Sequence, residues 1–113
     1  METKELMIGD KVMVKVLSQI PDTYVLHTWT ANDYSRSLQV KPIPLTPEIL
    51  EKNGWWYGIE DIWLHDGVSF CVEKWNGKFQ CYDITQIKLD SVHELQHALR
   101  LCGLTDLADN FKV

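Results

Sequence analysis

With 113 residues, the chain is long enough for one domain with its own hydrophobic core and too short for two. Hydrophobic residues make up 45% of it and charged residues 24%, which is typical of a globular rather than a disordered protein. The net charge is −5 and the basic residues are scattered singly, which argues against non-specific nucleic-acid binding through clustered lysine and arginine.

The chain carries no signal for export or for a membrane. No apolar run approaches the ~18 residues of a membrane span. Residues 1–5 are charged and lead directly into a strand-like segment, so we do not expect a signal peptide. The three cysteines form no CxxC motif, and free thiols suit a reducing compartment. We therefore expect a soluble, cytoplasmic protein without a membrane partner.

Short antiparallel strands are predicted for the N-terminal third. Residues 11–18 alternate valine with lysine and methionine, the pattern of a half-buried strand. Residues 23–30 predict its partner. A third strand is expected at about 37–43, where two prolines place its end at a sheet edge. Together these segments predict a small SH3-like barrel or sheet over residues 1–45.

A short helix is predicted over residues 46–54. Thr46 is a favourable N-cap, and Pro47 suits the first helical position because its missing N–H has no helical partner there. Gly54 supplies a left-handed C-terminal cap.

Residues 55–90 predict a three-stranded antiparallel meander. Asp66-Gly67 and Asn76-Gly77 are strong hairpin turns and place strands at 59–65, 68–75 and 78–85. Alternation along these strands divides the side chains between two faces. The strongly apolar face collects Trp63, Phe70, Val72, Phe79 and Cys81. The mixed face collects Ile62, Leu64, Cys71, Glu73, Trp75, Gln80 and Tyr82. The same register separates Cys71 from Cys81, so we expect no disulfide between them.

The longest helix is predicted over residues 91–102. Ser91 and Glu94 have the spacing of a capping box, and Gly103 ends the helix. One stripe of residues is expected to face the apolar side of the sheet: Val92, Leu95, Leu99 and Cys102. A further turn is expected at 105–110, followed by a frayed tail. The whole chain is thus expected to form one α+β domain over 1–113, with residues 91–113 as helix and tail.

The segment His93-Glu94-Leu95-Gln96-His97 matches the HExxH pattern of zinc hydrolases. On a helix both histidines share a face, so they could hold zinc while Glu94 acts on a bound water. A third ligand is needed, and the usual downstream positions hold unsuitable residues. His65 is the best upstream candidate. The alternative interpretation assigns Glu94 to the helix cap and places both histidines, with Arg100, on the polar side of an amphipathic helix.

Two other features offer weaker chemistry. Cys102 lies at a helix C-terminus, where the dipole disfavours a thiolate, so we expect it to be a small buried hydrophobe. The aromatic cluster at residues 55–57 could stack on bases or on a peptide, although core filling is the commoner role.

Two segments carry a resemblance to a known family: PIPLTPEILEKNG at 42–54 and VHELQHALRLCG at 92–103. Together with the aromatic strands between them, they resemble an uncharacterised family of small proteins from Bacteroidales genomes and their phages or mobile elements. The likeness spans about residues 40–104. It implies no activity, and a protease assignment would depend on the pentapeptide alone.

Three functional hypotheses follow. The first is a non-enzymatic accessory or binding module, without a cofactor, that contacts a protein partner or a second copy of itself. Its expected interaction surface is the mixed sheet face, and we single out Ile62, Leu64, Trp75 and Tyr82. The second is a minimal zinc-dependent hydrolase with Glu94 as catalytic residue and His93, His97 and His65 as metal ligands. The third is single-stranded nucleic-acid binding through the barrel-like half.

Overall fold

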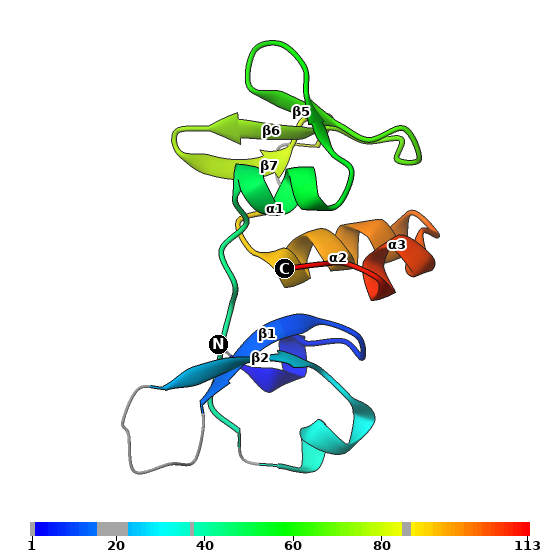
Figure 1. Cartoon of the computed structure of the whole chain (residues 1–113). Helices are drawn as coiled ribbons and strands as arrows, with labels where there is room; N and C mark the ends of the chain where they lie inside the picture. The colour runs from blue at the N-terminus through cyan, green and yellow to red at the C-terminus, as the bar shows by residue number, and fades with distance from the viewer. Residues whose placement is uncertain (1, 16–22, 37, 85–86) are drawn as a thin grey trace.

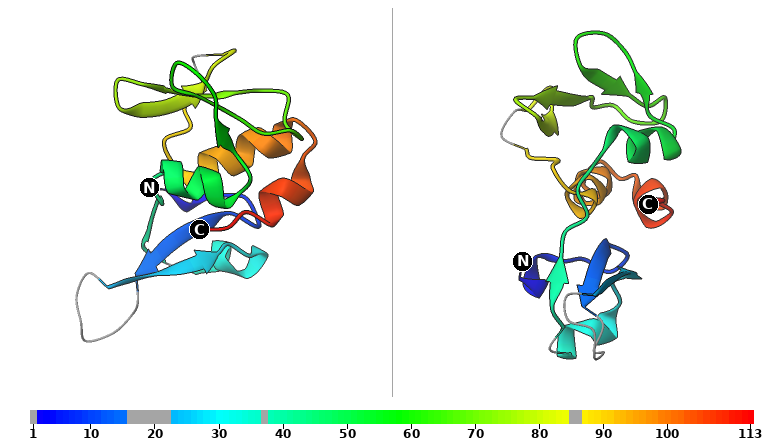
Figure 2. Two further views of the ribbon diagram at one scale, coloured as in Figure 1. Left: turned by 45° about the horizontal axis from the view of Figure 1, so that its top comes forward. Right: turned by 60° about the vertical axis from the view of Figure 1, so that its left-hand side comes forward.

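A computed structural model describes residues 2–15, 23–36, 38–84 and 87–113. The described chain is α+β, with two antiparallel sheets and helices between them (Figure 1). Views from other directions show the same layering, with α2 and α3 between a smaller N-terminal sheet and a larger C-terminal sheet (Figure 2). None of the helices in the described ranges is long and apolar enough to cross a membrane.

The N-terminal sheet has the strand order β2-β1-β3. It comprises β1 (Lys11–Lys15), β2 (Tyr24–Thr28) and β3 (Val40–Lys41), and is accompanied by two 3₁₀ turns, η1 (Thr3–Glu5) and η2 (Ala31–Ser35). The predicted alternation is confirmed, since Val12 and Val14 are buried against a small core of Leu6, Trp29 and Val40. β2 and β3 are shorter than predicted, whereas the predicted end of the first strand, residues 16–18, lies outside the described ranges. The described strands form an open sheet, so an SH3-like closure stays a prediction.

The helix α1 (Pro47–Lys52) forms where it was predicted. Thr46 caps it, since its Oγ1 accepts a hydrogen bond from Ile49 N at 3.2 Å. Asn53 ends the helix, and Gly54 has a left-handed φ of +86°. The Asn53 side chain then holds the C-terminal tail, with 2.7 Å bonds from its Nδ2 to Lys112 O and from Lys112 N to its Oδ1.

The C-terminal sheet has the order β4-β5-β6-β7. Its strands are β4 (Trp56–Tyr57), β5 (Ile62–Leu64), β6 (Val72–Trp75) and β7 (Lys78–Cys81). The predicted hairpin register is confirmed: Trp75 pairs with Lys78, and Val72 pairs with Cys81. All three cysteines are free. The strands are shorter than predicted, and β4 adds an edge strand to the predicted meander. The apolar face is buried as expected, through Trp63, Phe70, Val72, Phe79 and Cys81.

The helix α2 (Val92–Leu101) covers this buried face. Val92, Leu95 and Leu99 are buried as predicted, but Cys102 is exposed, so its assignment to the core is wrong. The reason is that α2 ends at Leu101, and the chain turns away there to enter α3 (Thr105–Asp109). The prediction of a frayed tail is also wrong, because Phe111 is only 3% exposed and belongs to the main core.

Candidate functional site

The polar side of α2 is not a solvated face but a buried contact with the N-terminal sheet. Gln96 is completely buried. Its Nε2 donates to Gly9 O at 3.0 Å and to Ala108 O at 2.8 Å, and its Oε1 accepts from Lys11 N at 2.8 Å. The polar side of this amphipathic helix is therefore covered by the N-terminal sheet. The helix packs on both sides, so its polar side chains bond to other groups of the chain instead of water.

Asp10 is the charged centre of this contact. It is completely buried, in the turn before β1. His97 Nε2 donates to its Oδ2 at 2.6 Å, Arg100 Nη1 donates to its Oδ1 at 2.5 Å, and Met7 N donates to Oδ2 at 2.8 Å. Burial alone would raise the pKa of Asp10, but these bonds outweigh it and hold the pKa below its usual value. The carboxylate is thus ionised and shared between two side chains of one helix face.

His93 lies one turn before His97 on the same helix. It is buried, with only 7% of its surface exposed. Its Nδ1 lies 3.1 Å from Ser91 Oγ, and Ser91 Oγ donates to Glu94 Oε1 at 2.7 Å. Glu94 also accepts from Ser91 N, which completes the predicted capping box. Burial is the main cause that lowers the pKa of His93, although nearby Asp10 and Glu94 act in the opposite direction.

The structure brings together only two of the three proposed zinc ligands. The rings of His93 and His97 lie 5.5 Å apart at an angle of 74°. Asp10 occupies Nε2 of His97, and the helix cap occupies one carboxylate oxygen of Glu94. Within the described ranges there is no cluster of three or more histidine, cysteine or acidic side chains placed to hold a metal.

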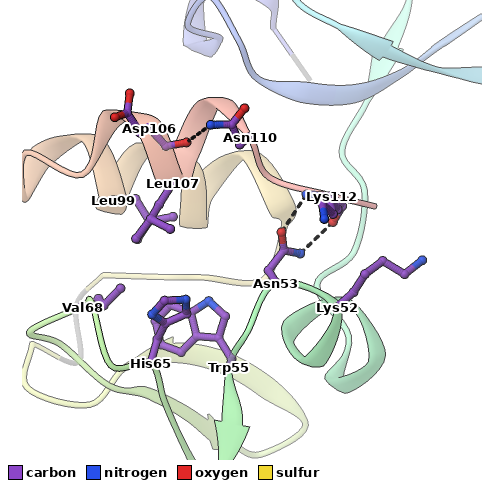
Figure 3. A pocket seen from close by; sticks show the side chains of 10 residues that line it. All are labelled: Lys52, Asn53, Trp55, His65, Val68, Leu99, Asp106, Leu107, Asn110 and Lys112. Atoms are coloured by element: carbon purple, nitrogen blue, oxygen red, sulfur yellow. Dashed lines mark hydrogen bonds between the residues drawn. The ribbon is translucent and has the colours of Figure 1, made fainter.

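His65 lines a different cavity, of about 250 Å³, between the C-terminal sheet and the helices (Figure 3). Its ring packs edge-on against Trp55 at 5.4 Å, and its Nδ1 accepts from Gly67 N at 3.1 Å. Leu99 and Leu107 reach toward it from α2 and α3, whereas Lys52 and Asp106 point away (Figure 3). The cavity interior is therefore mainly apolar, and it does not contain His93 or His97.

The mixed face of the C-terminal sheet points away from the helices. Trp75 is 61% exposed, and Tyr82 and Trp56 are about half exposed. Ile62 and Leu64 are half-buried among their neighbours on the sheet. Among the described residues, every helix lies on the opposite side of this sheet (Figure 1). We call this face, with Trp56, Ile62, Leu64, Trp75 and Tyr82, the outer face.

Sequence reasoning missed Asp10 and Gln96. The sequence assigned no role to Asp10, and it placed Gln96 only at a variable position within HExxH. A polar side chain at the centre of a helix face does not show which segment will cover it. Here the covering turn contains Gly9, which lies 87 residues before Gln96 in the chain.

No family model, curated protein or solved structure detectably matches this chain.

Proposed function

We propose that this chain is a non-enzymatic protein-binding module and that its outer face is the contact surface. The observation that carries this proposal is the exposure of Trp75 at 61%, on the same face as the exposed Trp56 and Tyr82. Large aromatic side chains left in water on one surface are typical of contact sites, since their burial supplies much of the binding energy.

The register of the sheet supports one continuous surface. Trp56 pairs with Leu64 across β4 and β5, and Ile62 pairs with Glu73 across β5 and β6. Directly opposed residues share a face in an antiparallel sheet. Tyr82 N donates to Cys71 O at 2.9 Å, so Tyr82 lies opposite Cys71 and extends this surface to the edge of the sheet beyond β6. The aromatic groups therefore border an aliphatic strip formed by Ile62 and Leu64.

Polar groups at one end of this face give it a rim. Glu73, Trp75, Gln80 and Lys88 line a shallow hollow there. An apolar centre with a polar rim is the usual composition of protein contact sites. We infer a protein partner that presents an aliphatic or aromatic patch flanked by charged side chains, with a second copy of the chain as the alternative partner.

The setting of this proposal comes from the sequence. The resemblance to Bacteroidales and phage proteins suggests an accessory factor of a mobile element that acts in the cytoplasm. We also propose that the N-terminal sheet closes into a small SH3-like barrel. The zinc-hydrolase alternative has less support, because His97 and Glu94 already bond to other groups of the chain and His65 lines a separate cavity.

Site-specific photo-cross-linking tests the proposal. A photoreactive phenylalanine analogue is placed at Trp75 or, as a control, at Leu101, which is 80% exposed at the end of α2. In the source cells, position 75 should give a discrete cross-linked species that Tyr82→Lys abolishes, and position 101 should not. Equal cross-linking from both positions would contradict the proposal. Sedimentation of the purified chain shows whether the partner is a second copy.

A further inference from the structure

A separate cavity of about 350 Å³ lies beside the N-terminus of α2. Its walls come from η1, from the segment after β3 and from the first turn of α2. The residues that line it are Glu5, Pro42, Pro44, Asp90, Ser91, His93 and Glu94. None of them belongs to the outer face, so this cavity is independent of the proposed function.

His93 presents a hydrogen-bond acceptor to this cavity. Ser91 Oγ has one proton, which it donates to Glu94 Oε1, so the Nδ1 of His93 must be the donor in its contact with Ser91 Oγ. In the neutral ring Nε2 then carries a lone pair. Among the described residues only Trp29 Nε1 is a polar side-chain atom both sealed from solvent and unpartnered. The Nε2 of His93 has no partner in those residues and is not sealed in this way, so it keeps contact with solvent, and His93 is one of the residues that line the cavity.

The cavity is also negatively charged. Glu5, Asp90 and Glu94 contribute three carboxylates, and its lining contains no lysine or arginine. Asp90 Oδ1 accepts from Phe79 N and Glu94 Oε1 accepts from Ser91, which leaves the second oxygen of each carboxylate for a ligand. The capping box already satisfies the first N–H groups of α2, so the helix end does not demand an anion. Burial keeps the His93 ring neutral by lowering its pKa.

We propose that this cavity binds an alkylguanidinium group, the chemistry of an arginine side chain. A guanidinium is a planar cation with five N–H donors and no acceptor, so it can donate to Nε2 of His93 and to two carboxylates at once. The rings of Pro42 and Pro44 provide an apolar wall for the methylene stem. A primary ammonium has fewer donors around a compact, strongly hydrated centre and fits this spread of acceptors less well.

The test is an NMR titration of the full chain with butylguanidine, a simple alkylguanidinium. The amide signals of residues 5 and 91–94 should shift and saturate. Butylurea, a neutral analogue, should leave them unchanged. Glu5→Gln should weaken butylguanidine binding by about fivefold. Glu2→Gln, which makes the same charge change at an exposed residue that does not line the cavity, should have no effect.

Replacement of the acceptor tests the role of His93. His93→Phe keeps a ring and removes Nε2, and should weaken binding by more than about tenfold. If this variant does not fold, the comparison of Glu5→Gln with Glu2→Gln still decides the matter. The source of the ligand is tested with a capped tripeptide that carries a central arginine, because tighter binding than that of butylguanidine assigns the guanidinium to a protein.

Three results would overturn the proposal. The first is equal binding of butylurea, which would remove the role of charge. The second is an equal effect of Glu2→Gln and Glu5→Gln, which would mean diffuse attraction to an acidic protein. The third is saturation of the same signals by zinc ions but not by butylguanidine, which would make the cavity a metal site.

Discussion

Nε2 of His97 lies 2.6 Å from Oδ2 of Asp10, and this bond joins the central helix to the turn that begins the N-terminal sheet. Arg100, one turn further along α2, bonds to the other oxygen of the same carboxylate. Asp10 is completely buried, so the two bonds replace the water that the carboxylate loses on folding. The HExxH segment thus contributes His97 to the contact between α2 and the N-terminal sheet.

Loss of the Asp10 carboxylate should destabilise the protein strongly. We expect Asp10→Ala to lower the free energy of unfolding by about 3 kcal/mol, because Arg100 would keep its charge in a mostly buried position without its partner. Asp109→Ala, which removes a half-exposed carboxylate 3.4 Å from the same guanidinium, should change it by less than ~1 kcal/mol. Urea unfolding measures both. Similar effects of the two substitutions would contradict the assigned role of Asp10.

The stability of the protein should fall in mild acid because of His93. Its pKa in the folded protein lies below the usual 6.5, so the unfolded chain takes up a proton at a pH where the folded chain does not. The contribution of the neutral ring is complete above pH 6.5 and is lost as the pH falls toward the folded pKa. Asp10, whose pKa is lowered from 3.8, acts only in stronger acid. Urea midpoints between about pH 7 and pH 5 should decline for the native chain, and less for His93→Gln.

A side chain at Gly9 should destabilise the protein. Its φ is +95°, and an added Cβ would lie 2.8 Å from Asp109 Oδ1 and 2.9 Å from Arg100 Nη2. Gly103 has a similar φ of +77°, but a Cβ there would meet no atom within 4 Å. Gly103→Ala therefore isolates the backbone strain, which costs about 1 kcal/mol. Gly9→Ala should cost more, because it also displaces Arg100. Thermal unfolding of the two variants compares them, and equal shifts in Tm would refute the close contact.

The two sheet faces should respond differently to loss of tryptophan. Trp63 lies on the apolar face and is 6% exposed. Trp63→Ala should lower the free energy of unfolding by about 3–5 kcal/mol. Trp75 is 61% exposed, and Trp75→Ala should change it by less than ~1 kcal/mol. Urea unfolding of both variants and of the native chain under the same conditions measures these free energies. A large loss for Trp75→Ala would mean that this side chain serves folding, and it would weaken the case for the outer face.

The sequence determined the local elements because their causes lie within a few residues. Thr46 and Ser91 begin their helices by satisfying N–H groups of the following turn, and Asn76-Gly77 sets the register of the strands beside it. Alternation along β5–β7 then separated the buried face from the outer face. The strands β2 and β3 were predicted too long, because an alternating pattern locates a strand better than it locates the ends of that strand.

Only the tertiary structure decided what covers the second side of α2. The bonds of Gln96 and His97 to Gly9 and Asp10 span 87 positions of the chain, and no local pattern encodes which turn will meet a helix face. The anchoring of the tail by Asn53 was not predicted for the same reason, since Lys112 lies far away in the chain. The exposure of Cys102 has a different cause, because α2 ends at Leu101. In sequence, the polar residues of α2 resemble a solvated or metal-binding face. Because α2 is buried on both sides, they instead form an internal hydrogen-bond network.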